Sequence, residues 1–344
     1  MITVKEIAQI CNVSPSTVSN ILNGKSNVGE DTRQRVLDVV KETGYRPNYF
    51  AQSMRKQTNR MIAVITEDLI EFSTGPIVEA IMAYCDDHNY RTILVNLRMY
   101  DKWKDTWYND DTKLQKEVDP VIREMVSVRV DAIIYVAGHC RTINCIPDDL
   151  DIPVVFAYGM CKSKKYPSVI IDDAKGGYDM TKYLLDQGHH SIGVIAGAMD
   201  NFHTISRLQG YRKALEESGI SYKPELLYYG DWKRASGYQI AKKLMKQDIT
   251  AVFCMNDNMA AGLYDYMYEH ELVVGKDIAI VGYDNKEIAD YLRPGLTTNE
   301  LPLRKIGKKA AEITIHSLLN GSLTKQNPIT QISCKVIERT SAMR

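Results

Sequence analysis

Short apolar runs alternate with helical stretches through most of residues 61–344, and this alternation constrains the fold more than any other feature of the chain. The runs include MIAVI, TILVN, DAIIYV and IPVVFAY, followed by IGVIAG, LLYYG, AVFCM and IAIVGYD. Strands that alternate with helices predict parallel sheets whose two faces are both covered. The alternation is interrupted near residues 159–166, so we expect two α/β units.

The composition indicates more than one domain and an uneven distribution of charge. The 344 residues are 44% hydrophobic, and 43 basic residues balance 43 acidic ones. Residues 1–60 carry nine Lys or Arg against five Asp or Glu, a net charge of +4 that leaves −4 for the remainder. A small basic module on a mildly acidic body is typical of a chain in which one part contacts nucleic-acid phosphates.

We expect neither a membrane span nor a disulfide or metal framework. No apolar run is long enough to cross a bilayer, and residues 1–20 lack the continuous apolar segment of a signal peptide. The seven cysteines are odd in number and form no CxxC pair, which is typical of reduced thiols in a cytoplasmic protein. His139, Cys140 and Cys145 lack a fourth ligand of matching spacing, so the sequence predicts no metal site and no cofactor.

The first 45 residues contain signals for three short helices. Thr3 and Glu6 form a capping-box pattern at the start of the first, and Ser14 followed by Pro15 marks the start of the second. A third helix is expected from about residue 31 to residue 43. Two short helices joined by a tight turn and closed by a third are the plan of a helix-turn-helix domain.

The exposed face of the second helix offers the short polar side chains Ser16, Thr17, Ser19 and Asn20. Such side chains donate and accept hydrogen bonds without the bulk that would keep a helix out of the major groove. Taken alone, the pattern leaves a second interpretation open, in which these residues are turn formers around an ordinary helical hairpin.

The stretch VKEIAQICNVSPSTVSNILNGKSNVGEDTRQRVLDVVKETGYRPNYFAQSMRK resembles the DNA-binding module of the LacI/GalR family of transcription regulators. The matching elements are A-x-x-x-x-V-S-x-x-T-V-S-x-x-L-N, V-x-x-x-T-R-x-x-V and G-Y-x-P-N-x-x-A. The resemblance implies base contacts by Pro15, Ser16 and Asn20. It implies contacts to the DNA backbone by Thr3, Thr17, Ser19, Asn23 and Thr32, and a contact from the loop by Asn27. Family members commonly carry Arg where Asn20 stands, and Asn favours adenine rather than guanine, so the operator preference stays open.

The resemblance also implies a hinge helix and linker at residues 48–60. Asn48, Ala51 and Met54 are its expected DNA-binding residues, with Ala51 allowing two hinge helices to approach and Met54 wedged into a minor-groove base step where Leu is usual. The family's core is a two-lobed α/β fold like that of periplasmic binding proteins. The implied domains are an all-α helix-turn-helix domain at residues 1–47, an N-terminal lobe of residues 61–159 with 291–320, and a C-terminal lobe of residues 160–290 with 321–344.

Ligands of open α/β sheets bind at the carboxyl ends of the strands, here in the cleft expected between the lobes. Arg207 offers a planar donor fork and Asp284 an acceptor for hydroxyls, and the resemblance implies that both clamp a sugar on which Trp232 stacks. It also implies a polar contact by Asn256 and places Glu67, Phe72 and Tyr158 on first-lobe loops of the same site. The residues alone leave ordinary explanations open: a surface charge for Arg207, lobe packing for Trp232 and a helix cap for Asp284.

Two segments depart from the family pattern. The loop at residues 67–72 lacks the Asn-Pro-Phe-Phe run of many members. Residues 99–111 are longer and more aromatic than usual, with Trp103, Trp107 and Tyr108. We interpret residues 99–111 as packing or rim structure of the lobe, with a reshaped effector site as the alternative.

The function that follows is a sequence-specific DNA-binding regulator, a repressor of a carbohydrate-utilisation operon that a small sugar effector releases or modulates. No catalytic motif occurs in the context it requires, so we do not expect an enzyme. A homodimer on a near-palindromic operator is expected, since two identical subunits present two reading heads. Two alternatives stay open: a purine-type corepressor stacked on Trp232, and control by a partner protein, such as a phosphoprotein, docked on the first lobe.

Overall fold

The fold is described from a computed structural model, which places residues 2–22, 24–25, 28–45, 59–104, 108, 110–321 and 328–343. Contacts divide the chain into two compact units, Met1–Asn59 and Arg60–Arg344. The first is an all-α head and the second is an α/β core, which confirms the expected fold class. The expected hinge helix and linker at residues 48–60 lies outside the described residues except for its last two positions.

The described part of the head folds into three short helices around a small apolar core. They are α1 (Val4–Ile10), α2 (Pro15–Leu22) and α3 (Glu30–Thr43), close to the bounds that the sequence predicts. The buried side chains of the head core are Ile7, Ala8, Cys11, Val18, Ile21 and Val36. Helix α3 ends at Gly44, whose φ of 63° forms a left-handed cap that favours glycine.

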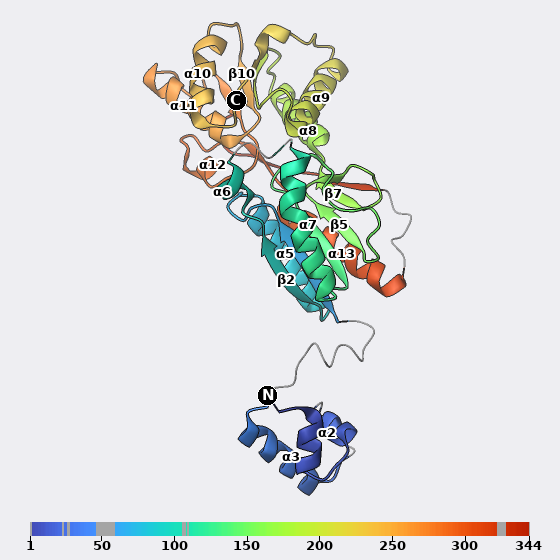
Figure 1. The fold of residues 1–344 in the computed structure, drawn as a ribbon. Helices are drawn as coiled ribbons and strands as arrows, with labels where there is room; N and C mark the ends of the chain where they lie inside the picture. Colours follow the sequence, from blue (N-terminus) through green and yellow to red (C-terminus); the bar gives the residue numbers. More distant parts are fainter. Residues whose placement is uncertain are drawn as a thin grey trace. The chain divides into compact units, whose positions relative to one another are not determined.

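Among the described residues, the first lobe of the core contains a six-stranded parallel sheet (Figure 1). From edge to edge, its strands are β13 (Ile329–Ile332), β7 (Ser168–Ile171), β5 (Val154–Ala157), β3 (Ala132–Val136), β1 (Met61–Thr66) and β2 (Arg91–Asn96). Alternate residues of β1 enter opposite hydrophobic cores, Ile62 and Val64 on one face, Ala63 and Ile65 on the other. The covering helices are α5 (Thr74–Asp87) and α13 (Leu303–Asn320) on the first face and α7 (Asp111–Ser127) on the second. Both faces are therefore covered, as the continuous apolar runs predict.

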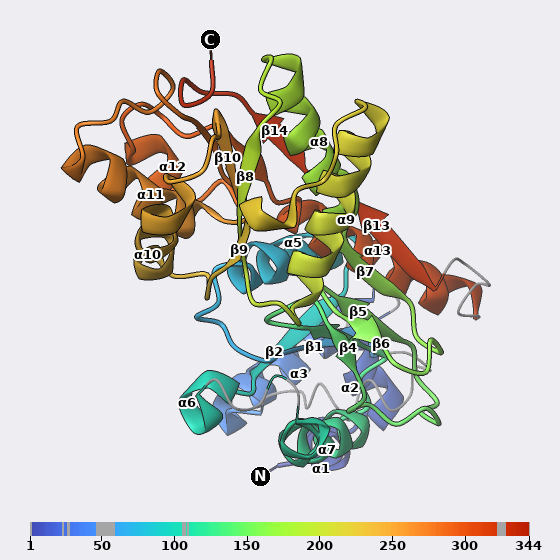
Figure 2. The ribbon, with the colours of Figure 1, turned by 90° about the horizontal axis from the view of Figure 1, so that it is seen from above.

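The second lobe, described throughout residues 173–296, contains a four-stranded parallel sheet ordered β11–β10–β8–β9. The strands are β8 (Ile192–Ala196), β9 (Leu227–Tyr229), β10 (Ala251–Cys254) and β11 (Ala279–Val281). Its helices, seen from above in Figure 2, are α8 (Asp173–Asp186), α9 (Phe202–Glu217), a 3₁₀ turn (Pro224–Leu226), α10 (Arg234–Leu244), α11 (Asp257–Glu269) and α12 (Ile288–Tyr291). Two segments that pass between the lobes pair antiparallel as β12 (Thr298–Glu300) and β14 (Lys335–Ile337).

The boundary between the lobes falls later in the chain than the sequence predicts. Strand β7 still belongs to the first sheet, because it pairs with β5, whereas residues 160–290 were expected in the second lobe. Strand β13 also joins the first sheet by pairing with β7, so residues 321–344 are not confined to the second lobe. The interruption at residues 159–166 has a local cause: its strand β6 (Met160–Cys161) pairs with β4 (Thr142–Ile143) of the same lobe.

The aromatic segment at residues 99–111 packs on the first lobe wherever it is described. It contains the short helix α6 (Met99–Trp103), in which Met99 is fully buried. Trp103 and Tyr108 lie partly buried against the hydrophobic core under α7. Lys113 of α7 holds its ammonium group 5.3 Å from the centroid of the Trp103 ring. These contacts agree with the packing interpretation, and Trp107 lies outside the described residues.

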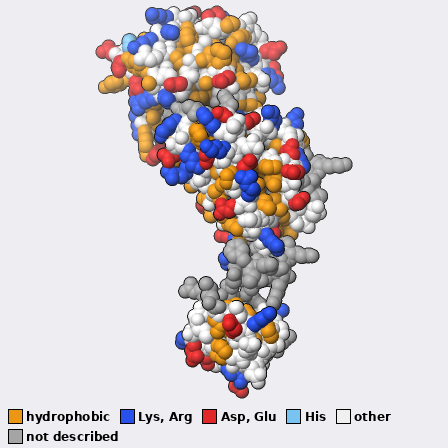
Figure 3. Space-filling view, viewed as in Figure 1, with side chains coloured by type: hydrophobic (Ala, Val, Ile, Leu, Met, Phe, Trp, Pro, Cys, Tyr) orange, Lys and Arg blue, Asp and Glu red, His pale blue; other side chains and the backbone are white. Residues whose placement is uncertain are grey.

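Charged side chains of both signs are interspersed with hydrophobic ones on the visible face of the core (Figure 3). No helix in the described part of the chain combines the length and the apolar character needed to cross a bilayer. The seven cysteines, all within the described residues, are free thiols; six are buried and Cys334 is partly exposed.

The helix pairs of the second lobe touch backbone to backbone at glycines. A Cβ atom on Gly210 of α9 would lie 1.9 Å from the carbonyl oxygen of Ala174 in α8. In return, a Cβ atom on Gly177 of α8 would lie 2.2 Å from the carbonyl oxygen of Arg207 in α9. Because backbone atoms cannot swing aside as side chains do, these glycines fix the distance between the two helices and hence the position of Arg207.

We expect Gly210→Ala to lower the free energy of unfolding by about 1–3 kcal/mol, because the added methyl group forces α8 and α9 apart. Gly75→Ala is the matched control, since a Cβ atom at Gly75 meets nothing within 4 Å and alanine favours helix more than glycine does. Urea denaturation of both variants measures the difference. Equal stability of the two variants would contradict the close approach at Gly210.

Candidate functional site

Helix α2 begins with a hydrogen-bonded cap that leaves its short polar side chains toward the surface. The Ser14 hydroxyl accepts from the backbone N–H of Thr17 at 3.1 Å and lies 2.7 Å from the Ser16 hydroxyl. The exposed or half-buried members of this face are Pro15, Ser16, Thr17, Ser19 and Asn20. Val18 and Ile21 point the other way, into the head core. The helix therefore presents a polar face of low bulk, as a major-groove reading helix requires.

The other predicted DNA contacts lie elsewhere in the head or outside the described residues. Thr3 caps α1 with the predicted capping box: its hydroxyl accepts from the Glu6 N–H, and its own N–H donates to the Glu6 carboxylate at 2.7 Å. These hydrogen bonds lower the pKa of Glu6. Thr32 lies half-buried in the first turn of α3. The predicted contacts that fall outside the described residues are Asn23, Asn27, Asn48, Ala51 and Met54.

In the core, polar and aromatic side chains gather where the carboxyl ends of strands from both sheets meet. We call this cluster the inter-lobe site. Its members are Phe72 and Tyr158 from the first lobe, Asp173 at the start of α8, and His203, Arg207, Trp232, Asp284 and Lys286 from the second lobe. Two contacts join the lobes here: the Lys286 ammonium lies 4.0 Å from the centroid of the Phe72 ring, and the Tyr158 and His203 rings have centroids 5.6 Å apart.

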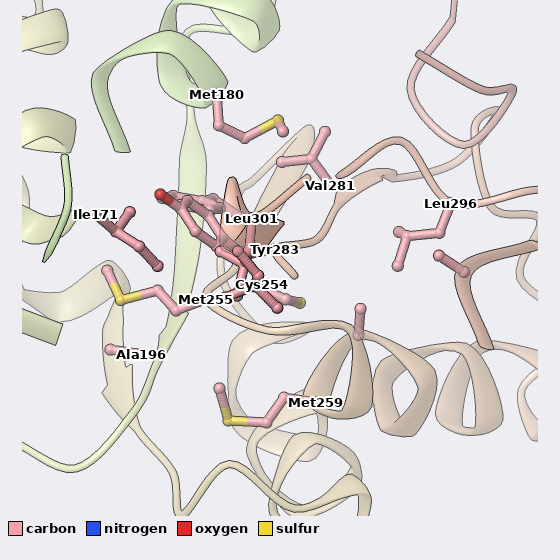
Figure 4. Packing of buried hydrophobic residues seen from close by; sticks show 14 of the residues in the cluster. Ile171, Met180, Ala196, Cys254, Met255, Met259, Val281, Tyr283, Leu296 and Leu301 are labelled. Atoms are coloured by element: carbon pink, nitrogen blue, oxygen red, sulfur yellow. The ribbon is translucent and has the colours of Figure 1, made fainter. Parts of the chain in front are cut away.

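Arg207 is 2% exposed, so it is not an ordinary surface charge. Its Nε donates to Asp173 at 2.8 Å and its Nη1 donates to the Met255 carbonyl oxygen at 2.5 Å. The guanidinium carbon lies 3.7 Å from the centroid of the Tyr283 ring, and Figure 4 shows that ring within the buried cluster that includes Met255. Burial alone would lower the pKa of Arg207, but the charges of Asp173, Tyr283 and Asp284 and the hydrogen bond to Asp173 together outweigh it and raise the pKa. Arg207 therefore stays charged.

Asp173 and His203 also belong to the site, although the sequence did not predict them. The buried Asp173 carboxylate lies 2.7 Å from His203 Nδ1 and also accepts from Arg207. Burial acts to raise the pKa of Asp173, but the charges of His203 and Arg207 outweigh it and lower the pKa. A positional signal was present, because Asp173 opens a helix one residue after the apolar run SVII, at the end of a strand where ligand sites form.

Trp232 is held in place from two sides. Its ring lies against Gly197, where a Cβ atom would come within 1.9 Å of it. Its carbonyl oxygen accepts from Asn256 Nδ2 at 2.9 Å, while Asn256 Oδ1 accepts from the Met259 N–H at 2.8 Å and so caps α11. Through these two hydrogen bonds Asn256 positions Trp232 and caps α11, and its predicted contact with an effector stays a prediction.

Asp284 lies in a strained loop after β11, with a φ of 111°, and does not cap α12, whose N-cap is Glu287. The Lys286 ammonium lies 3.3 Å from its Oδ2. Behind it, the buried Asp257 accepts from the Thr298 hydroxyl at 2.6 Å and from the backbone N–H of Lys286 at 2.7 Å. Burial raises the pKa of Asp284, and burial followed by the charge of Asp284 raises the pKa of Asp257.

Of the predicted first-lobe residues, Phe72 and Tyr158 reach the inter-lobe site and Glu67 does not contact it. The buried Glu67 carboxylate accepts from the Tyr135 hydroxyl, the Gly138 N–H and both Nη atoms of Arg141, at 2.7–3.0 Å. With these partners, Glu67 fixes the loop after β3, and the geometry gives it a positioning role.

Four polar groups of the inter-lobe site make no hydrogen bond within the described chain: Arg207 Nη2, Asp284 Oδ1, Tyr158 Oη and His203 Nε2. They combine donors with an acceptor beside the aromatic faces of Trp232 and Phe72. A few convergent polar groups among aromatic walls are the usual construction of a small-molecule site. The arrangement can therefore bind a small ring that carries several hydroxyl groups.

Two known families match separate parts of the chain, one in the head and one in the core. The family described as "Bacterial regulatory proteins, lacI family" matches residues 3–48. The family described as "Periplasmic binding protein-like domain" matches residues 181–342.

Individual relatives match along most of the chain. HTH-type transcriptional repressor PurR of Vibrio vulnificus (strain CMCP6) is 31% identical over 324 residues, which cover 92% of each chain. The ribose operon repressor of Haemophilus influenzae is 28% identical over 350 residues, which cover 100% of each chain. Among solved structures, the Lac repressor dimer bound to operator and the anti-inducer ONPF gives a TM-score of 0.77 at 24% identity, covering 100% of this chain and 99% of that chain.

Proposed function

This chain belongs to the LacI/GalR family of DNA-binding transcriptional regulators, and from that premise we propose that it is a repressor whose affinity for operator DNA is set by a small sugar. The sugar is placed at the inter-lobe site. The observation that carries this proposal is the group of open donors and acceptors of Arg207, Asp284, Tyr158 and His203 beside Trp232. Sugar hydroxyls pair with such groups, while the apolar face of the ring packs on an aromatic side chain.

A homodimer is the assembly that fits this function. The Lac repressor is a dimer on its operator, and two identical heads read a near-palindromic sequence. Because the inter-lobe site takes residues from both lobes, effector affinity depends on how the lobes are arranged. A bound effector then shifts the population between arrangements that differ in operator affinity. We place this binding step in the cytoplasm, where bacterial operator DNA lies, and assign the chain no catalytic step.

A purine effector is the second candidate. A relative named PurR is 31% identical, and a purine base also stacks on an aromatic face such as that of Trp232. A corepressor of this kind raises operator affinity, whereas the sugar of the first proposal lowers it.

A thermal-shift panel of mono- and disaccharides and purines, followed by operator titration with the stabilising compound, separates these candidates. We expect one class of sugar to raise Tm and to weaken operator binding. A purine that raises both Tm and operator affinity would replace the sugar. If no compound acts while operator binding is intact, control by a partner protein docked on the first lobe becomes the better account.

We expect Asn20→Ala to relax base preference at one symmetric position in each half-site by about 1–3 kcal/mol, because an Asn contact to a base edge is lost. Non-specific DNA affinity should change little. Gln34→Ala, on an exposed face of α3, is the control and should leave the preference intact. Binding-site selection followed by gel-shift titration of single-base variants measures the effect. An equal fall in specific and non-specific affinity would identify Asn20 as a backbone contact.

A further inference from the structure

The cations at the inter-lobe site are already paired with carboxylates of the same chain. Within the described residues, the pairs are Arg207 with Asp173 at 2.8 Å, Lys286 with Asp284 at 3.3 Å, and Arg141, on the neighbouring loop, with Glu67 at 2.8 Å. Lys233, next to Trp232 in the chain, is exposed, and its charge interacts with that of Asp231. An anionic ligand would therefore have to compete with a carboxylate for each cation.

Three helix N-termini at the same place, those of α8, α9 and α11, are also capped by side chains, whereas α5 and α10 begin without a side-chain cap. The Asp172 carboxylate accepts from the Lys175 N–H at 3.0 Å at the start of α8. Asn201 accepts from the His203 N–H at 2.9 Å at the start of α9, and Asn256 caps α11. Phosphate groups bind at helix N-termini through such N–H groups, and at α8, α9 and α11 a side chain of the chain already accepts from one of them.

Carboxylates outnumber the cations of the site. Asp257, directly behind Asp284, has neutral partners: the Thr298 hydroxyl and a backbone N–H. Glu71 faces Lys286 from the first lobe and lies 3.5 Å from His139 Nε2. A phosphate dianion entering this site would lose its hydration and meet cations that carboxylates of the chain already pair with, and both effects oppose binding.

We propose that the inter-lobe site selects an uncharged polyhydroxy effector and excludes the phosphate ester of the same compound. Arg207 Nη2 can donate to a hydroxyl of a neutral ring, and Asp284 Oδ1 can accept from another. The ring itself brings no net charge into the site. This inference rests on the proposed function, since it concerns the effector of that site. An effector of this kind is the substrate, rather than the product, of a phosphoryl-transfer reaction. The chain then senses a sugar that such a reaction consumes.

Calorimetric titration of the full chain with matched pairs tests the proposal. The pairs are ribose with ribose 5-phosphate, glucose with glucose 6-phosphate, and adenine with AMP. In any pair that binds, we expect the uncharged member to bind at least about 100-fold more tightly, a difference of about 2.7 kcal/mol. A phosphate ester that binds as tightly as its parent would overturn the proposal. Binding by adenine alone would replace the sugar of the proposed function and still support the exclusion of phosphate.

Inorganic phosphate provides a second test that needs no known effector. We expect the wild type to show no saturable change in tryptophan fluorescence with phosphate, and Asp284→Asn to gain saturable binding because Lys286 loses its carboxylate partner. The gain should disappear in Asp284→Asn combined with Lys286→Met. Asp265→Asn, which frees Arg234 on the surface, is the matched control and should behave as the wild type does. Phosphate binding by the wild type that Lys286→Met removes, or no gain in Asp284→Asn, would overturn the proposal.

Discussion

Replacing Arg207 by lysine is expected to weaken effector binding about tenfold or more, while operator binding without effector stays close to that of the wild type. Lysine keeps a positive charge for the buried Asp173 but loses the planar fork, so it cannot also reach the Met255 carbonyl oxygen and a ligand. One lost charge-assisted hydrogen bond corresponds to about 1.5–3 kcal/mol, and each factor of ten in affinity to about 1.4 kcal/mol. The expected phenotype is a repressor that stays on its operator at effector concentrations that release the wild type.

Lysine is a better test than alanine because Asp173 is buried. Arg207→Ala would leave that carboxylate with His203 as its remaining side-chain partner, and removing one partner of a buried pair costs about 3–5 kcal/mol of stability. Arg234→Lys is the matched control, since Arg234 pairs with Asp265 on the surface. A corepressor mechanism predicts the opposite phenotype, weak operator binding by Arg207→Lys. A variant that responds to effector as the wild type does would remove Arg207 from the effector site.

The head and the order of strands and helices could be predicted because their signals are local. The capping box at Thr3, the Ser14–Pro15 start of α2 and the apolar runs of the core each act within a few residues, and the helices lie near their expected bounds. The boundary between the lobes could not be predicted in this way. It depends on the pairing of β7 with β13, strands more than a hundred residues apart, and hydrophobic periodicity contains no information on such pairing.

The same distinction between local signals and distant partners applies to the residues of the inter-lobe site. Arg207, Trp232 and Asp284 could be proposed because each stands at a strand end or helix start with a side chain suited to a sugar. The positioning roles of Glu67 and Asn256 could not, because they depend on hydrogen bonds with partners distant in sequence, Arg141 and Trp232. The surroundings of Arg207 could not be predicted either. The sequence shows its charge, but only the fold shows that it is buried in contact with Asp173 and Tyr283.

Asp257→Asn is expected to stabilise the core at neutral pH and to matter much less in acid. Burial, and then the charge of Asp284, raise the pKa of Asp257 from 3.8 to about 7. Between about pH 4 and pH 7, the unfolded chain has lost a proton that the folded chain keeps. The stability of the wild type therefore falls as the pH rises through this window and is level above it. Asparagine has no charge to bury, so its advantage grows through the same window.

Both hydrogen bonds of Asp257 can survive its replacement by asparagine. The asparagine Oδ1 accepts from the Lys286 N–H, while its Nδ2 donates to the Thr298 hydroxyl. One pKa unit corresponds to about 1.4 kcal/mol, so the variant should gain about 2–3 kcal/mol over the wild type between pH 5 and pH 8. Urea unfolding at both pH values measures the gain. Asp186→Asn, which breaks a surface pair with Lys182, is the control and should show little change with pH. If the advantage of Asp257→Asn does not grow with pH, Asp257 is already ionised in the folded protein at pH 5. A full negative charge would then stand behind Asp284 throughout this range, and it would oppose an anionic effector more strongly still.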